Sequence, residues 1–190
     1  MTLLIIGIVV FLGTHLLPTV PGLRQSLAAR LGENGYKALF SLVSIAAFVL
    51  LVYGFAKAPA VQVWSPPGWT RWVAIVLMLP AFIFLVAAYV PGEIKAKVKH
   101  PFLIAIKIWA LAHLIANGDL ASIILFGSFL AYAGYDRITL KRRKPTALIE
   151  PPEPGSRRND IIAVLLGSAL YVAFLIWLHP LLIGTAMLPQ

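Results

Sequence analysis

Residues 101–135 read PFLIAIKIWALAHLIANGDLASIILFGSFLAYAGY, and this stretch decides the fold. It contains two apolar runs, Pro101–Ile115 and Leu120–Tyr135, on either side of the triplet Asn117-Gly118-Asp119. Each run approaches the length of about 20 residues that a helix needs to cross a hydrocarbon core about 30 Å thick. Asn and Asp are common turn residues, and Gly118 permits the left-handed conformation that a tight reversal needs. The stretch therefore predicts a helical hairpin within a membrane.

Four further apolar runs occupy much of the remaining chain: Leu3–Leu17, Ala38–Phe55, Trp72–Val90 and Ile161–Leu178. Of the 190 residues, 60% are hydrophobic and 12% are charged, which is about half the charged fraction of ordinary soluble domains. A water-soluble fold of this length has no means of burying so much apolar surface. We therefore predict an all-α integral membrane bundle of about six transmembrane helices, which forms a single domain over residues 1–190.

The first run is expected to belong to the mature protein rather than to a cleaved signal peptide. No Lys or Arg precedes it, and the first basic residue, Arg24, follows it. A signal peptide has the opposite order, with its positive charge before the apolar stretch.

The basic residues predict the orientation of the bundle. The net charge is +9, and thirteen of the sixteen basic residues lie in alternate loops, as the positive-inside rule requires. These are Arg24, Arg30, Lys37, Lys95, Lys97, Lys99, Arg137, Lys141, Arg142, Arg143, Lys144, Arg157 and Arg158. We therefore expect those loops in the cytoplasm, both termini on the non-cytoplasmic side, and contact with anionic lipid headgroups. Because the charges follow this pattern, we expect no nucleic-acid partner.

The segments between the runs predict two further features. Residues Gly22–Gly35 carry leucines four positions apart, which favours a short amphipathic helix at the membrane surface. The segment Lys141–Asp160 combines many charges with four prolines and a glycine. Such a segment buries too little apolar surface to order itself. We expect a mobile cytoplasmic linker over about 141–160 and a last helix over about 161–178.

Histidines are the main candidates for chemistry. His15 and His113 lie inside apolar runs, where an ionisable side chain normally faces the bundle interior and has a partner. The chain has no cysteine, so thiolate ligands are excluded and a haem held by two histidines is the most plausible metal site. In the alternative interpretation, each histidine only donates a hydrogen bond to a backbone carbonyl or hydroxyl across a helix interface. His100, which precedes Pro101, is a further candidate ligand.

Lys107 lies in the same apolar run as His113 and is the second candidate for cofactor binding. Its ammonium group would pair with a propionate or another acidic group of a ligand. Alternatively, its four-carbon stem lets the charge reach the cytoplasmic headgroups.

The blocks Lys99-His100-Pro101-Phe102 and 109–119 (WALAHLIANGD) resemble the signature of NnrU-type membrane proteins. Thr14-His15 and the stretch 35–42 (GYKALFSL) are also similar, and the resemblance covers about residues 1–140. It implies a bacterial inner-membrane protein that is linked with denitrification, specifically nitrite and nitric oxide reduction, and that has a redox or denitrification partner. The superfamily includes 15-cis-zeta-carotene isomerase, which binds haem b through two histidines. By motif these fall on His15 and His113.

The resemblance to the isomerase is incomplete, because Ala110 stands where that enzyme has a cysteine able to ligate iron. Helix counting also places His15 and His113 about 13 Å apart in depth at 1.5 Å per residue, unless a tilt or the Pro-Gly end of the first helix removes the difference. His15 with His100 is the alternative pair.

Three functions remain open at this point. The first is a haem b protein of the NnrU type. The second is a lipid-phase enzyme, either a cis–trans isomerase of a polyene or, less well supported, a membrane methyltransferase. The third is a non-catalytic scaffold whose histidines only bridge helices. Whether the chain is an enzyme is therefore undecided by the sequence.

Overall fold

The fold is described from a computed structural model, which describes residues 1–20, 22–142 and 155–184. The helices are α1 (Thr2–Leu16), α2 (Leu23–Ala56), α3 (Thr70–Ala87), α4 (Glu93–Val98), α5 (Pro101–Ala116), α6 (Leu120–Arg142), α7 (Arg157–Ala173) and α8 (His179–Ile183). A 3₁₀ turn over Leu17–Thr19 follows α1, and a π-helical turn over Phe174–Leu178 joins α7 to α8. The predicted all-α class is confirmed, since no strand occurs in the described ranges.

Four segments are long and apolar enough to cross a membrane: Thr2–Thr19, Leu23–Ala56, Thr70–Ala87 and Arg157–Ile183. Helix α5 is apolar but shorter, at 16 residues. Exposed large apolar side chains are frequent on the long helices, for example Val76 at 69% and Leu165 at 66% exposure. These helices therefore expose an apolar surface of the kind that lipid tails cover.

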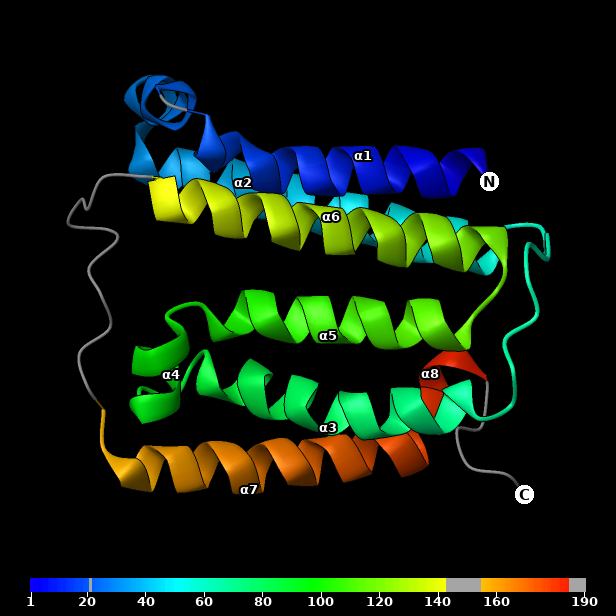
Figure 1. The fold of residues 1–190 in the computed structure, drawn as a ribbon. Helices are drawn as coiled ribbons and strands as arrows, with labels where there is room; N and C mark the ends of the chain where they lie inside the picture. Colours follow the sequence, from blue (N-terminus) through cyan, green and yellow to red (C-terminus); the bar gives the residue numbers. More distant parts are fainter. Residues whose placement is uncertain (21, 143–154, 185–190) are drawn as a thin grey trace.

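The long helices lie side by side in the order α2, α1, α6, α5, α3 and α7, and successive long helices along the chain alternate in direction (Figure 1). The N-terminus, α8 and the connection between α5 and α6 lie at the same end of the bundle (Figure 1). Helix α4 lies at the opposite end (Figure 1). We call these two ends the α8 end and the α4 end.

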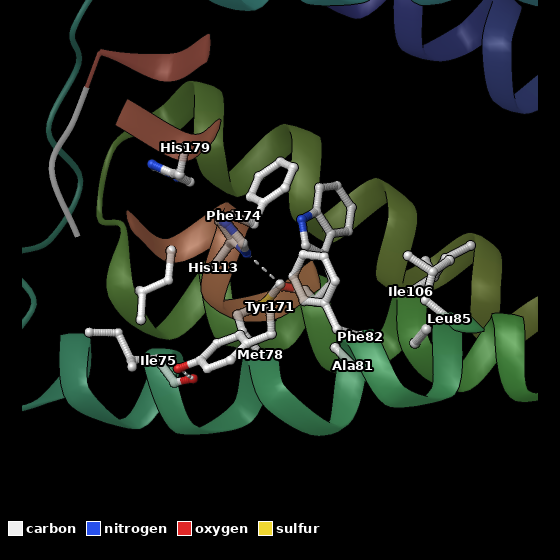
Figure 2. A pocket seen from close by; sticks show the side chains of 13 residues that line it. Ile75, Met78, Ala81, Phe82, Leu85, Ile106, His113, Tyr171, Phe174 and His179 are labelled. Atoms are coloured by element: carbon white, nitrogen blue, oxygen red, sulfur yellow. Dashed lines mark hydrogen bonds between the residues drawn. The ribbon is translucent and has the colours of Figure 1, made fainter. Parts of the chain in front are cut away.

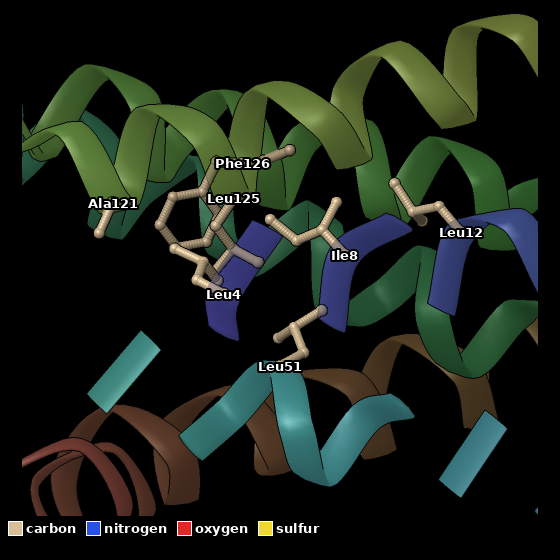
Figure 3. Packing of buried hydrophobic residues seen from close by; sticks show 8 residues of the cluster. Leu4, Ile8, Leu12, Leu51, Ala121, Leu125 and Phe126 are labelled. Carbon is tan, nitrogen blue, oxygen red and sulfur yellow. The ribbon is translucent and has the colours of Figure 1, made fainter. Parts of the chain in front are cut away.

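Glycines allow α1 and α2 to pack closely. A Cβ at Gly7 would lie 2.6 Å from Cα of Leu51, and one at Gly54 would overlap the backbone of Leu4. Small residues at such crossings are typical of membrane helices, because close backbone approach maximises van der Waals contact. Beside this crossing, side chains of α1 pack against α2, α5 and α6 (Figure 3). The buried cluster consists of Leu4, Ile8, Leu12, Leu51, Ala110, Ala121, Leu125 and Phe126.

The predicted hairpin is confirmed, because α5 ends at Ala116 and α6 begins at Leu120. The expectation that Gly118 adopts a left-handed conformation is wrong, because the glycines with positive φ are Gly22, Gly32 and Gly184. Glycine is needed at 118 for a different reason, since a Cβ there would overlap the carbonyl oxygen of Trp64. The amides of Val63 and Trp64 both donate to the Gly118 carbonyl, at 2.8 and 3.2 Å. The turn therefore serves as a docking point for the loop between α2 and α3.

The segments between the spans agree with the sequence in part. Helix α2 is interrupted at Gly32 (φ +73°, ψ +160°), so its first segment, 23–31, forms the expected short helix and turns away from the rest (Figure 1). The linker expected at 141–160 is shorter than that, because α6 continues to Arg142 and α7 already begins at Arg157. Residues 143–154 of this linker lie outside the described part of the chain. The last helical span, Arg157–Ile183, consists of α7, the π-helical turn and α8 and exceeds the expected 161–178 at both ends.

Candidate functional site: an apolar cavity with two histidines

A cavity of about 290 Å³ lies between α3, α5, α7 and the π-helical turn with α8 (Figure 2). It is partly enclosed, and most of its surface is apolar and aromatic. The lining residues are Ile75, Met78, Ala81, Phe82, Leu85, Ala105, Ile106, Trp109, His113, Tyr171, Phe174, Leu175 and His179. A volume near 300 Å³, apolar walls and a few polar groups are the usual features of a small-molecule site.

His113 is held in one tautomer by its own helix. Its Nδ1 lies 2.8 Å from the Trp109 carbonyl oxygen (Figure 2). A carbonyl only accepts, so the proton lies on Nδ1 and the neutral ring keeps a lone pair on Nε2. The ring also stacks on Phe126, with centroids 4.5 Å apart and an interplanar angle of 27°. An imidazole whose other nitrogen donates to a backbone carbonyl has the usual arrangement of a metal ligand.

His179 lines the same cavity from α8, whereas His113 lines it from α5 (Figure 2). His179 begins α8 directly after the π-helical turn, and its ring lies 6.4 Å from that of Phe174. His113 and His179 both line this cavity. A π-helical turn inserts an extra residue into a helix and occurs frequently at functional sites. Here it changes the direction in which the residues after α7 project.

Tyr171 links α7 to α3 at one wall of the cavity. Its hydroxyl donates to the Ile75 carbonyl oxygen at 3.0 Å. Pro80, which lies inside α3 as the sequence shows, has no N–H to donate to the carbonyl of Val76. The tyrosine thus supplies a donor beside the turn of α3 in which helical bonding is already interrupted.

The four histidines are divided between the two ends of the bundle. His15 is next to the last residue of α1 and His100 directly precedes α5, and both positions are at the α4 end (Figure 1). His113 lies near the end of α5 and His179 begins α8, and both positions are at the α8 end (Figure 1).

His113 lines this cavity, whereas His15, the other residue expected to hold iron, is not among its lining residues. His15 contacts Phe40 and Tyr132, whereas His113 contacts Phe126. Tyr132 and Phe126 are six residues apart on α6, which corresponds to about 9 Å along the helix. The ring contacts between the two histidines run through Phe11, Phe129 and Trp109.

His15 nevertheless has the same local arrangement as His113, since its Nδ1 lies 2.8 Å from the Phe11 carbonyl oxygen. The alternative interpretation of the sequence expected a backbone or hydroxyl partner across a helix interface, but both histidines are hydrogen-bonded to the carbonyl four residues earlier. In both cases the partner belongs to the same helix rather than to a neighbour.

His100 and Lys107, the other two candidates, do not line the cavity. Burial lowers the pKa of His100, Arg137 and Lys99 lower it further, and Asp136 opposes them. Lys107 is half-buried in α5, and it forms no hydrogen bond or ion pair with any residue of the described ranges.

No group of three or more His, Cys, Asp or Glu side chains comes together in the described part of the chain. A bare metal ion held by three protein ligands is therefore not supported there. A haem brings four nitrogen donors of its own and needs only one or two imidazoles. The two histidines and the apolar walls of this cavity are donors and surfaces that suit the iron and the porphyrin of such a group, although none of the lining residues is a cation that could pair with its propionates. His15 and His113 are not brought together at this cavity.

The sequence alone did not associate His179 with this site. Its position just after a long apolar run marked it only as a residue near the outer face. The signal that was available is depth, because the predicted topology already places both His113 and His179 toward the non-cytoplasmic side.

A family model described as NnrU protein matches residues 3–187 of the chain. Comparison with curated proteins finds no match, and comparison with solved structures finds none either. The family match extends from the first helix to beyond α8 and so includes the last span, which the resemblance over residues 1–140 had left out. The chain therefore belongs to the NnrU family.

Proposed function

We propose that this NnrU-family chain crosses the bacterial inner membrane six times, with both termini on the non-cytoplasmic side. The helices α1, α2, α3, α5, α6 and α7 alternate in direction, and α8 lies at the same end of the bundle as the N-terminus (Figure 1), which supports an even number of crossings. Helix α5 is only about 24 Å long at 1.5 Å per residue, but α3 and α6 pack against it. A helix flanked in this way need not match the full thickness of the lipid.

Charge supports this orientation. The short helix α4 carries Lys95 and Lys97, and Arg137 of α6 donates to the Val98 carbonyl oxygen at 3.0 Å at the same end. Basic residues on the cytoplasmic side are also those that would contact anionic headgroups.

Single cysteines test the orientation, because the chain has none of its own. Val63 in the loop between α2 and α3 is 57% exposed, and Lys97 in α4 is also exposed. In intact spheroplasts, an impermeant maleimide should label Val63→Cys at once and Lys97→Cys only after permeabilisation. The reverse result would contradict the proposed orientation.

We further propose that the cavity at His113 holds haem b and that the protein supports nitrite and nitric oxide metabolism. The observation that carries this is the His113 ring, whose Nε2 lone pair is left available beside an apolar cavity. When bound, the haem supplies an iron that binds a small gas or passes an electron to a redox partner. The chain would supply the imidazole, fix its tautomer through Trp109, and exclude water with aromatic side chains.

The test is an absorption spectrum of the detergent-purified protein, oxidised and then reduced. We expect a Soret band and a pyridine haemochrome of the b type, both lost or strongly reduced in His113→Ala. Leu111→Ala is the matched control, since Leu111 is 44% exposed on the same helix and does not line the cavity. A colourless wild-type protein from haem-replete cells would contradict haem binding.

A lipid-phase enzyme is the second candidate, and the apolar lining of the cavity favours it. Such walls suit a polyene better than they suit the adenosyl cofactor of a methyltransferase, which needs polar contacts. Quenching of tryptophan fluorescence by an added carotenoid, reduced in Phe82→Ala, would support this candidate. A scaffold without ligand would show neither the Soret band nor quenching.

A further inference from the structure

We propose that His179 is the second histidine that contacts the ligand seated at His113, in the role that the sequence had assigned to His15. The inference rests on the proposed haem function and names the second side chain of the same site. It concerns a residue that the resemblance does not cover, because the matching motifs end at about residue 140.

The shared cavity is the first support. His113 reaches it from α5 and His179 from α8, so that the two imidazoles belong to different helices (Figure 2). Two ligands from separate helices can approach the two faces of a flat group, whereas two ligands on one helix turn cannot. Phe174 lies in ring contact with His179, and Phe126 stacks on His113. Each imidazole is thus held beside an aromatic ring.

Depth is the second support. His113 lies four residues before Asn117 in the turn between α5 and α6, and His179 follows the whole of α7. Both are therefore at the α8 end, while His15 is at the α4 end (Figure 1). The separation of about 9 Å along α6, together with the rings of Phe11 and Phe129, keeps His15 from the cavity.

The chemistry follows from this geometry. A haem iron has one free coordination position on each face, and two neutral imidazoles produce a six-coordinate, low-spin iron. Removal of one imidazole leaves a five-coordinate iron that is high-spin when no other ligand replaces it. The spin state therefore reports the number of histidines that contact the group, independently of any activity.

The experiment titrates hemin into the detergent-purified full-length protein and records absorption and electron paramagnetic resonance spectra. We expect low-spin hemin in the wild type, and a mainly high-spin form in His179→Ala with affinity lower by about tenfold or more, the loss typical of removing even a supporting partner of a metal ligand. Added imidazole should restore the low-spin spectrum in His179→Ala. Leu181→Ala, which changes a residue of α8 that is 78% exposed, controls for disturbance of that helix.

The outcomes separate the two proposals. Low-spin hemin in both the wild type and His179→Ala, with a high-spin form in His15→Ala or His100→Ala, would overturn the role of His179 and leave haem binding intact. Failure of the wild type to bind hemin would overturn both. If Leu181→Ala lost hemin to the same extent as His179→Ala, the loss would reflect the fold of α8 and the role of His179 would be rejected.

Discussion

Replacement of Gly7 by alanine should destabilise the pairing of α1 with α2, whereas the same replacement at Gly13 should not. Both glycines lie in α1. A Cβ at Gly7 would meet Cα and N of Leu51 at 2.6 Å, and a Cβ at Gly13 would have no neighbour within 4 Å. The two variants therefore add the same methyl group to the same helix, and only one of them meets the backbone of α2.

The magnitude follows from the distance. Ordinary contact begins at 3.4 Å, so the two backbones must separate by about 0.8 Å, a gap at which contacting atoms lose a quarter to a half of their dispersion energy. Leu4, Ile8 and Leu51 of the buried cluster pack across or beside this crossing. Overpacking of this kind costs about 1–3 kcal/mol. Gly13→Ala should lie between no change and a gain of about 1 kcal/mol from the better helix propensity of alanine.

The assay is reversible unfolding by sodium dodecyl sulfate in mixed micelles, followed by far-ultraviolet circular dichroism. Gly54→Ala, whose Cβ would overlap the backbone of Leu4, should behave as Gly7→Ala does. The double variant should lose less than the two single losses combined, because one displacement of α1 relieves both overlaps. Equal stability of Gly7→Ala and Gly13→Ala would refute the reasoning, because it would mean that α1 and α2 do not approach each other closely at Gly7.

Three further predictions concern other contacts. Tyr171→Phe removes the hydrogen bond to the Ile75 carbonyl and should cost about 0.6 kcal/mol, at most about 2 kcal/mol, in the same unfolding assay; an unchanged midpoint would mean that this bond adds nothing. Asp160 accepts hydrogen bonds from the amides of Glu93 and Ile94 at 3.1 and 3.0 Å. Asp160→Asn should therefore lower the free energy of unfolding by about 0.5–2 kcal/mol and speed amide hydrogen exchange at the start of α4. Arg158→Gln, which changes an exposed side chain, should do neither. Burial and Arg137 lower the pKa of His100 below its usual 6.5. As the pH drops below about 6.5, His100 is therefore protonated in the unfolded chain before it is protonated in the folded protein, and stability falls until the pH reaches the folded pKa. His100→Gln should flatten that part of the melting temperature profile, and an unaltered slope would assign the effect to another group.

The helical class, the apolar runs and the hairpin could be predicted from the sequence, because each depends on local features. An apolar run long enough to cross lipid has few alternatives to a helix, and a polar triplet between two such runs leaves little choice but a reversal. The prolines after Leu17 likewise predicted the end of the first helix, and α1 ends at Leu16, just before the 3₁₀ turn over Leu17–Thr19. These predictions required no knowledge of which helices are neighbours.

The roles of individual glycines and the membership of the cavity could not be predicted in this way. Gly118 was assigned to a backbone conformation, but the structure needs it because the loop carrying Trp64 packs against the turn. That contact joins residues more than 50 positions apart and leaves no periodic signal in the sequence. Tyr171, Met78 and Phe82 come to one cavity for the same reason, since α3 and α7 are neighbours in space and distant in the chain.

Pairing of the histidines is an intermediate case, because the topology constrains depth even when it says nothing about neighbours. A side chain near the end of a span can only meet side chains near the same membrane surface, and the chain reverses direction at each span. The predicted topology left His113 and His179 toward the non-cytoplasmic side and offered His15 with His100 as the alternative pair, but it did not pair His113 with His179. The resemblance favoured His15 with His113, a pair that crosses between these two levels. Where a motif and a depth argument disagree in a polytopic chain, depth offers an independent test of the pair, because six residues along a helix already correspond to about 9 Å.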